Sequence, residues 1–211
     1  HIRLASEPLY PSARPEGVQN QMVTATMAIA ILTMGTLLAP LLIIEEKESH
    51  TFEALLVSPA SLTQVITGKA LAGAAYCLAA VLAVLLLTGY LVAQWHILLL
   101  AILLGTVFAV GLGTLLGLLT ESQASLGVWG GLVLMTLLSV VIFQFFDLSK
   151  WSPVMQVMVN FFPTTALSRL VGIGLAGQIP PDILWQSTFS LLALSIVIYL
   201  LVAWALRRSR H

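Results

Sequence analysis

Long apolar runs alternate with short polar breaks along most of the chain. A helix needs about 20 mainly apolar residues to cross a bilayer. Five runs reach that length: 22–44, 68–93, 97–120, 124–146 and 183–206. The turns at 94–96 and 121–123 are tight, whereas the connections 45–67 and 147–182 are long. The pattern predicts an all-α membrane protein with five transmembrane helices in one domain, residues 22–206.

Composition strengthens this interpretation. Of 211 residues, 59% are hydrophobic and 9% are charged, and the mean hydropathy is +1.00. Soluble domains carry roughly a quarter charged residues, so lipid must be the solvent for most of this chain. The formal net charge of zero gives no support to nucleic-acid binding. Cys77 is the single cysteine and can form no internal disulfide. The four histidines have no metal-ligand spacing.

The charges at the ends of the runs predict an orientation. Three arginines lie in 207–211, directly after the last run. The positive-inside rule makes these residues a cytoplasmic tail. Five spans then place the connection 45–67 in the cytoplasm and the polar segment 1–21 outside. Because the first residue is not methionine, we expect the sequence to begin inside a longer protein. A sixth span upstream would bring the true N-terminus inside, in a multi-pass protein of the cell membrane.

The connection 147–182 is too apolar for a solvated loop and too broken for two full spans. A proline interrupts it, and Arg169 lies within its second half. We therefore predict two short helices that lie in, or dip into, the outer interface as an external hairpin. An alternative is one full span at 164–180, which would reverse the topology beyond it. The residues that anchor and divide the predicted hairpin are Trp151, Phe162 and Pro163.

The predicted spans lack the chemistry of several function classes. No membrane-core position holds Asp, Glu, Lys or Arg, whereas ion-coupled transporters and proton pumps usually need an ionisable group near the midplane. The chain also has no phosphate-binding loop, since alanine follows Gly68-Lys69 and Thr63 stands where the first glycine would be. No nucleophile and base are paired, so we expect no catalytic residue, cofactor site or metal site in this chain.

Small residues recur every four positions in the third run, which places them on one helix face: Gly105, Ala109, Gly113 and Gly117. Such a ladder lets another helix approach closely. Gly127 and Gly131 repeat the pattern in the next run. Two interpretations stay open, which are packing within one subunit and an interface between subunits.

The connection 45–67 contains a short amphipathic pattern. Phe52, Leu55 and Leu56 fall at i, i+3 and i+4, which gives one apolar face. Glu53 lies beside this face, and Pro59 ends the turn. The acidic flanks favour a helix that docks a protein, because a helix that rests on anionic lipid would be basic. The alternative is a solvated loop that only stops membrane transfer.

These residues also carry a resemblance. The series Glu46-Lys47-Glu48, Thr51-Phe52-Glu53, Leu55-Leu56-Val57-Ser58-Pro59 and Gly68-Lys69 resembles the signature of ABC-2 type transporter permeases, the membrane subunits of ABC exporters. Ser49 and His50 depart from it, because a basic residue and a glycine are usual there. The resemblance implies that the segment is a cytoplasmic coupling helix, formed by Glu46, Lys47, Glu48, Thr51, Phe52, Glu53, Leu55, Leu56 and Pro59.

The resemblance further implies partners and a function. The coupling helix would sit against separate ABC ATPase subunits, which bind ATP and Mg. Two permease subunits, identical or different, would form a dimer, and the outer hairpin would be re-entrant. The expected function is the permease subunit of an ATP-driven exporter in a bacterial or archaeal membrane, with an apolar pathway for amphipathic or hydrophobic cargo such as a drug, a lipid or a lipid-linked molecule. The alternatives are an ion-coupled carrier or channel, and a membrane protein that docks a partner without transport.

Overall fold

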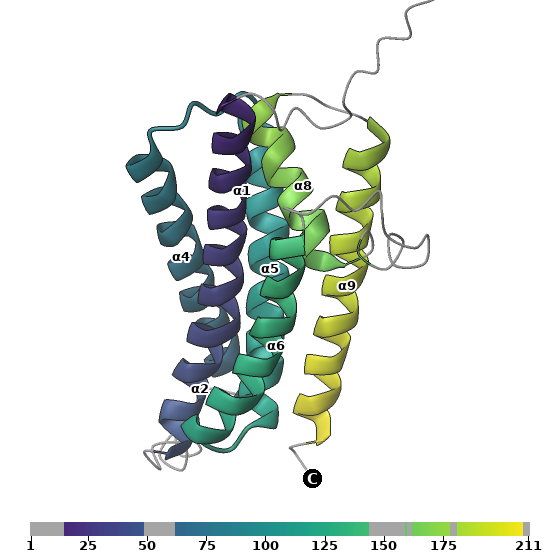
Figure 1. The fold of residues 1–211 in the computed structure, drawn as a ribbon. Helices are drawn as coiled ribbons and strands as arrows, with labels where there is room; N and C mark the ends of the chain where they lie inside the picture. Colours follow the sequence, from purple (N-terminus) through teal and green to yellow (C-terminus); the bar gives the residue numbers. More distant parts are fainter. Residues whose placement is uncertain (1–14, 49–61, 144–158, 160–161, 178–180, 209–211) are drawn as a thin grey trace, which may run out of the picture.

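The computed structural model describes residues 15–48, 62–143, 159, 162–177 and 181–208, and every structural statement below concerns these residues. All the elements in this part of the chain are helices (Figure 1). In chain order they are α1 (Pro15–Thr33), η1 (Met34–Leu38), α2 (Ala39–Glu48), α4 (Leu62–Thr88), α5 (Trp95–Leu119), α6 (Gln123–Phe143), α8 (Pro163–Ala176) and α9 (Pro181–Arg208).

Five helices in the described part are long and apolar enough to cross a membrane. They are Gln19–Glu45, Gln64–Thr88, Trp95–Leu119, Gln123–Val141 and Pro181–Leu206. The first of them joins α1, η1 and α2 into one continuous helix. The prediction of an all-α membrane protein with five candidate transmembrane helices is confirmed.

The second predicted run extends too far. Helix α4 ends at Thr88, and Gly89 follows it with a φ of +58°. This left-handed conformation lets the Gly89 N–H bond to the Leu85 carbonyl at 3.1 Å and so closes the helix. Trp95, expected within a turn, instead opens α5. The predicted span was too long because Tyr90, Leu91 and Val92 continue the apolar run without continuing the helix.

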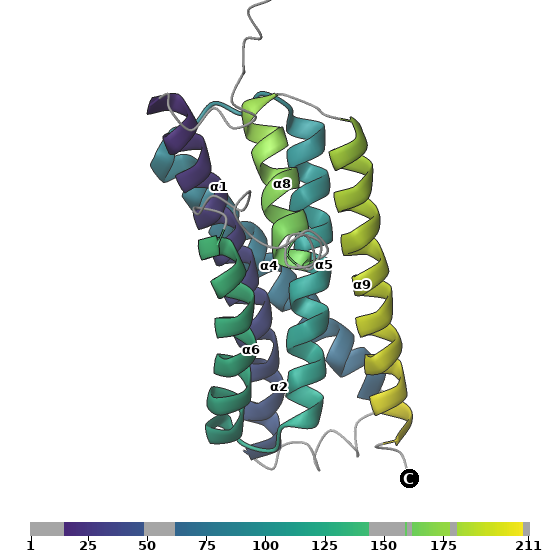
Figure 2. The same ribbon diagram turned by 45° about the vertical axis from the view of Figure 1, so that its right-hand side comes forward.

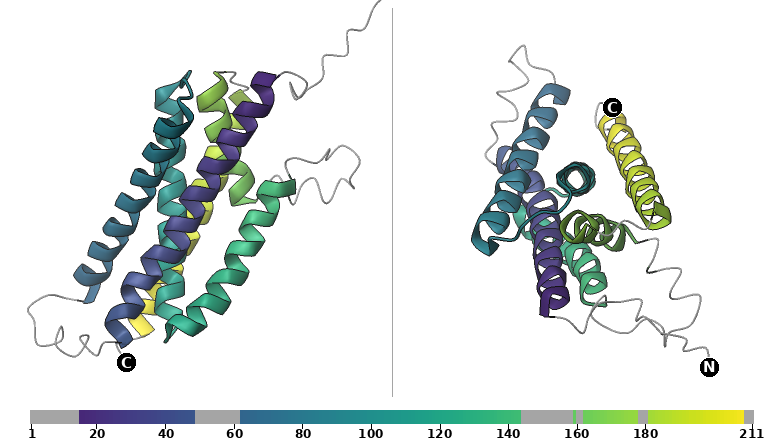
Figure 3. Two further views of the ribbon diagram at one scale, coloured as in Figure 1. Left: turned by 60° about the vertical axis from the view of Figure 1, so that its left-hand side comes forward. Right: turned by 90° about the horizontal axis from the view of Figure 1, so that it is seen from above.

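Helix α5 stands in the middle of the bundle. It contacts α1, η1, α2, α4, α6, α8 and α9, and the views in Figures 2 and 3 show it between α4 and α9. Leu98, Ala101 and Ala109 of α5 are fully buried in the main apolar core. By contrast, the outer helices leave large apolar side chains exposed, among them Leu86, Leu87, Met135 and Leu200. Such extensive exposure of apolar side chains suits a surface that faces lipid.

The two ends of the bundle differ in how many charged residues they hold. The last turn of α2, the start of α4, the turn between α5 and α6 and the last turn of α9 share one end (Figure 1). We call it the charged end, because Glu45, Glu48 and Glu121 lie there. The start of α1, the turn between α4 and α5 and the end of α8 lie at the opposite end. The side of the membrane that each end faces stays a prediction.

Candidate functional site

Helix α8 lies inside the bundle, antiparallel to α5. A Cβ atom added at Gly105 would lie 2.5 Å from Leu167 Cδ1, and one at Gly174 would lie 2.9 Å from the Leu98 nitrogen. Position 105 of α5 thus pairs with 167 of α8, and position 98 pairs with 174, as expected for antiparallel helices. Continuing this pairing places Pro163 beside residue 109, near the middle of α5. With 14 residues, α8 is about 21 Å long, and a bilayer core is about 30 Å thick. It is too short to be the alternative span at 164–180.

The C-terminal end of α8 is fixed by the turn between α4 and α5. Gly177 has a φ of +75°, and its N–H bonds to the Ile173 carbonyl at 2.9 Å. The Gln94 backbone N–H donates to the Gly174 carbonyl at 2.9 Å, and Gln94 Nε2 donates to the Gly177 carbonyl at 3.2 Å. These bonds satisfy carbonyls that a helix C-terminus leaves unpaired. The sequence analysis did not single out Gln94.

The position of α8 differs from a helix lying on the membrane surface. Leu167, Leu170 and Val171 are fully buried, and Phe162 packs, partly buried, against the main core. Phe162 was expected at the interface, but the register of α8 places it near the middle of the bundle. Pro163 is the first residue of α8, where proline is favoured. Trp151 and the first helix of the predicted hairpin lie outside the described residues, so the hairpin stays a prediction.

The bundle interior is more polar than the sequence analysis expected. Arg169, which was assigned to an external connection, is half-buried on α8 beside the N-terminal half of α5. Several buried hydroxyls have no hydrogen-bond partner: Thr24, Thr36, Thr106, Thr164, Thr165, Ser168 and Ser187. Other buried hydroxyls bond back to the carbonyl four residues earlier, as Thr114 and Ser195 do. An entirely apolar interior is therefore not what the described helices form.

The ladder of small residues on α5 is used within this chain. Its first member, Gly105, contacts α8. On the C-terminal half of α5, a Cβ atom at Gly113 would lie 2.9 Å from Pro40 Cδ, and one at Gly117 would lie 2.9 Å from Pro40 Cα. A Cβ atom at Gly35 would lie 2.5 Å from the Cβ of Ala109. The ladder thus seats η1 and α2 against α5. In contrast, Gly127 and Gly131 of α6 have nothing within 4 Å of an added Cβ.

The π-helical turn η1 has a local cause. Pro40 has no N–H, and its ring would press on the carbonyl four residues earlier, at Thr36, in a regular α-helix. The wider turn over Met34–Leu38 immediately precedes this proline and relieves the conflict. The turn also packs Gly35 against Ala109. Sequence analysis missed this feature, although Gly35 and Pro40 together were a signal for it.

At the charged end, Glu48 connects α2 to α6. Glu48 Oε1 accepts a hydrogen bond from the Gln123 backbone N–H at 2.8 Å. Gln123 is the first residue of α6, so this N–H has no partner within its own helix. Ser122 and Ser125 also cap the start of α6, because each hydroxyl accepts the other residue's backbone N–H at 3.2 Å. The anionic Glu48 also suits the positive end of the α6 dipole.

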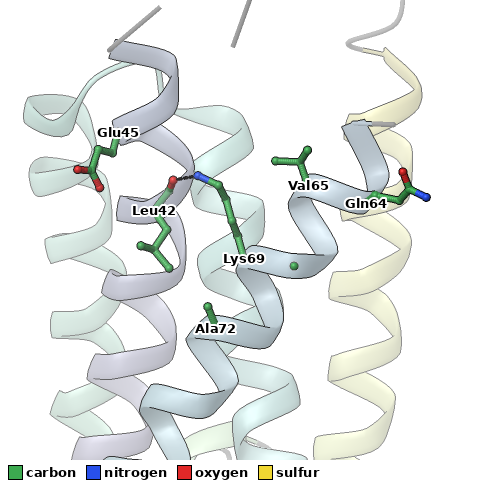
Figure 4. Close-up of a pocket in the computed structure, with 7 residues that line it drawn as sticks. Leu42, Glu45, Gln64, Val65, Lys69 and Ala72 are labelled. Atoms are coloured by element: carbon green, nitrogen blue, oxygen red, sulfur yellow. Dashed lines mark hydrogen bonds between the residues drawn. The ribbon is translucent and has the colours of Figure 1, made fainter. Parts of the chain in front are cut away.

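Lys69 makes a second connection at the same end. Its Nζ donates a hydrogen bond to the Leu42 carbonyl and so links α4 to α2 (Figure 4). A cavity of about 540 Å³ opens beside this bond. Its walls come from α2 and α4, and its lining residues are Leu42, Glu45, Gln64, Val65, Gly68, Lys69 and Ala72. The charged end therefore holds α2 between α4 and α6 by two side chains.

The structure describes only part of the predicted coupling segment. Glu46, Lys47 and Glu48 form the end of α2, and α4 begins at Leu62. The remaining predicted coupling residues are Thr51, Phe52, Glu53, Leu55, Leu56 and Pro59, and they lie outside the described residues. Their amphipathic helix stays a prediction. Both ends of the segment nevertheless lie at the charged end, next to the Glu48 and Lys69 contacts.

The fold and the apolar outer surface define a multi-pass membrane protein. The chain also matches the family described as ABC-2 family transporter protein over residues 2–205. Because this match covers nearly the whole sequence, the chain belongs to the ABC-2 transporter family, as the signature around residues 46–69 indicated. No match was found among curated proteins or solved structures.

Proposed function

We propose that this chain is the permease subunit of an ATP-driven ABC-2 exporter, and that it transports nothing without separate ATPase subunits. The observation that carries the proposal is the family match over residues 2–205, together with the coupling signature at residues 46–59. The positions of α2 and α4 support it, because these two helices flank that segment and share the charged end. The charged end faces the cytoplasm of a bacterial or archaeal cell in this proposal.

The proposed mechanism is mechanical. The ATPase subunits bind ATP and Mg and close, and the closure pushes on residues 46–59. The push moves α2, which lies against the small residues Gly113 and Gly117 of α5. Because α5 contacts every other helix of the described bundle, a shift of α2 changes the packing throughout. The movement opens a pathway at the interface with a second permease subunit.

The proposed cargo is amphipathic. The exposed apolar surfaces of α4, α6 and α9 suit contact with lipid, which could deliver a hydrophobic tail. Thr165, Ser168 and Arg169 on α8 add polar groups inside the bundle that could accompany a head group. A drug, a lipid or a lipid-linked molecule has this mixed character. The second permease subunit is proposed to lie against α6, where Gly127 and Gly131 face away from this chain.

Two substitutions in the coupling segment test the proposal. Truncating a large aromatic side chain at the centre of an interface typically costs 2 kcal/mol or more, which weakens binding roughly 30-fold. We therefore expect Phe52→Ala to lose the ATPase subunit during co-purification and to lose transport. Glu53→Ala should keep much of the complex but separate ATP hydrolysis from transport, because charges at an interface rim contribute less to affinity.

The two variants are compared in vesicles with ATP-driven movement of a fluorescent lipid and with co-purification of the ATPase. The matched control is Leu71→Ala on the exposed outer face of α4, which should behave as the wild type. If Phe52→Ala and Glu53→Ala both hold the ATPase and transport at the wild-type rate, the segment is not a coupling helix. Ion current through the purified chain without ATP would instead favour a channel or carrier.

A further inference from the structure

Glu48 belongs to the series that the ABC-2 resemblance assigns to the ATPase contact, but its carboxylate points to a different partner. Its Oε1 accepts the Gln123 backbone N–H at 2.8 Å across 75 positions of sequence. Glu48 is the last residue of α2, and Gln123 is the first residue of α6. The contact therefore joins the end of the helix that leads into the coupling segment to the start of a peripheral helix.

We propose that Glu48 is a positioning residue that transmits movement of α2 to α6 through the Gln123 N–H, rather than a contact to the ATPase. This inference rests on the proposed function, since it assumes that ATP drives movement of the coupling segment. Helix α6 has few other attachments near its start that reach α2. Among its first four residues only Leu126 is buried, and it packs in a small cluster with Ile44 of α2 and Leu116 of α5.

The chemistry of the contact suits this role. The first N–H groups of a helix have no partner within the helix, and the helix dipole favours a negative charge beside them. Ser122 and Ser125 already satisfy each other's N–H groups, so Glu48 supplies the acceptor that Gln123 lacks. Both residues are exposed, which limits the strength of the bond. Exposed charges at helix ends shift an equilibrium about two- to fivefold, enough for a contact that forms and breaks during a transport cycle.

The donor is a backbone N–H, and this allows a test that leaves Glu48 in place. Gln123→Pro removes the N–H, while proline at the first position of a helix is well tolerated. We expect Glu48→Ala and Gln123→Pro each to lower the cargo moved per ATP hydrolysed about two- to fivefold. The double variant should be no worse than either single variant, because both substitutions break the same bond. Glu48→Gln, which keeps an acceptor oxygen, should recover part of the loss.

The controls separate this inference from its alternatives. Glu45→Ala replaces an exposed glutamate one turn earlier on α2 and should match the wild type. ATPase co-purification should be unchanged in Glu48→Ala and Gln123→Pro. The inference is overturned if Glu48→Ala releases the ATPase while Gln123→Pro does not, because Glu48 would then contact the ATPase directly. It is equally overturned if both variants move as much cargo per ATP as the wild type.

A second readout does not depend on transport. Amide hydrogen exchange at Gln123 in the reconstituted wild-type protein should be about two- to fivefold slower than in Glu48→Ala. Equal exchange rates would show that the bond does not form and would overturn the inference. If the exchange rates differ but the wild-type chain moves no cargo with its ATPase, the proposed function fails, and the bond is only a helix cap.

Discussion

Replacing Gly113 by alanine should destabilise the bundle more than any other glycine-to-alanine change on α5. A Cβ atom at Gly113 would press on the Gly35 carbonyl oxygen, and it would lie 2.9 Å from Pro40 Cδ and 3.2 Å from the Gly35 carbonyl carbon. These atoms belong to backbone or to a proline ring, so no flexible side chain can move aside. The added methyl group must push η1 and α2 away from α5.

The expected magnitude follows from this rigidity. Adding a methyl group to a packed core typically costs 1–3 kcal/mol, and we expect about 3 kcal/mol for Gly113→Ala because backbone must shift. Gly105→Ala should cost about 1 kcal/mol, because its Cβ would meet the mobile end of Leu167. Within this chain Gly131→Ala has nothing within 4 Å of the added atom, so in the separated subunit it should be neutral or slightly stabilising through the better helix propensity of alanine.

The assay is the free energy of unfolding, measured for the three variants by SDS titration of the protein in mixed micelles. A loss of 3 kcal/mol changes the folded-to-unfolded ratio roughly 150-fold, which such a titration resolves easily. The packing of α5 against η1 and α2 would be refuted if Gly113→Ala were as stable as Gly131→Ala. An equal loss in Gly105→Ala and Gly113→Ala would contradict the distinction between backbone and side-chain contacts.

Two further substitutions test the ends of the helices. Lys69→Met removes the bond to the Leu42 carbonyl but keeps an apolar stem. We expect this substitution to lower the free energy of unfolding by roughly 1 kcal/mol in the same titration. Lys69→Arg, which keeps a donor, should be closer to the wild type. Gly177→Ala should cost about 1–2 kcal/mol, because its φ of +75° disfavours alanine and the new Cβ would lie 2.9 Å from the Ala93 Cβ. Gly68→Ala, with nothing within 4 Å, is the matched control, and equal stability of the two alanine variants would contradict the strained cap.

Apolar run length was sufficient to predict the five candidate transmembrane helices, because lipid requires long uninterrupted helices. Where a helix stops was harder to predict. The run through Ala93 looked helical, but the left-handed Gly89 ended α4 five residues earlier than the run suggests. The position of α8 could not be predicted from the sequence either, because a short apolar helix can lie on a membrane or insert into a bundle. The burial of its side chains and its contacts with Gly105 and Leu98 distinguish the two positions.

The candidate site was likewise predictable from the sequence only in part. The resemblance indicated residues 46–59 as a coupling segment, and the family match shows the ABC-2 family over residues 2–205. The coupling role of these residues stays a prediction. No local pattern could reveal that Glu48 reaches Gln123 or that Lys69 reaches Leu42, since both bonds join residues far apart in the sequence. The small-residue ladder was visible, but its partners Gly35 and Pro40 became apparent only from the packing of η1 and α2.

Docking of an ATPase subunit on residues 46–59 can be tested by site-specific photocrosslinking. A photoreactive phenylalanine is placed at Phe52 and, as a control, at Trp129 on the exposed apolar face of α6. After irradiation of intact cells, adducts are identified by mass spectrometry. If residues 46–59 dock the ATPase, position 52 captures a protein with an ATP-binding phosphate loop and position 129 does not. Absence of that adduct at position 52, or its equal formation at both positions, would show that the segment is not the docking site.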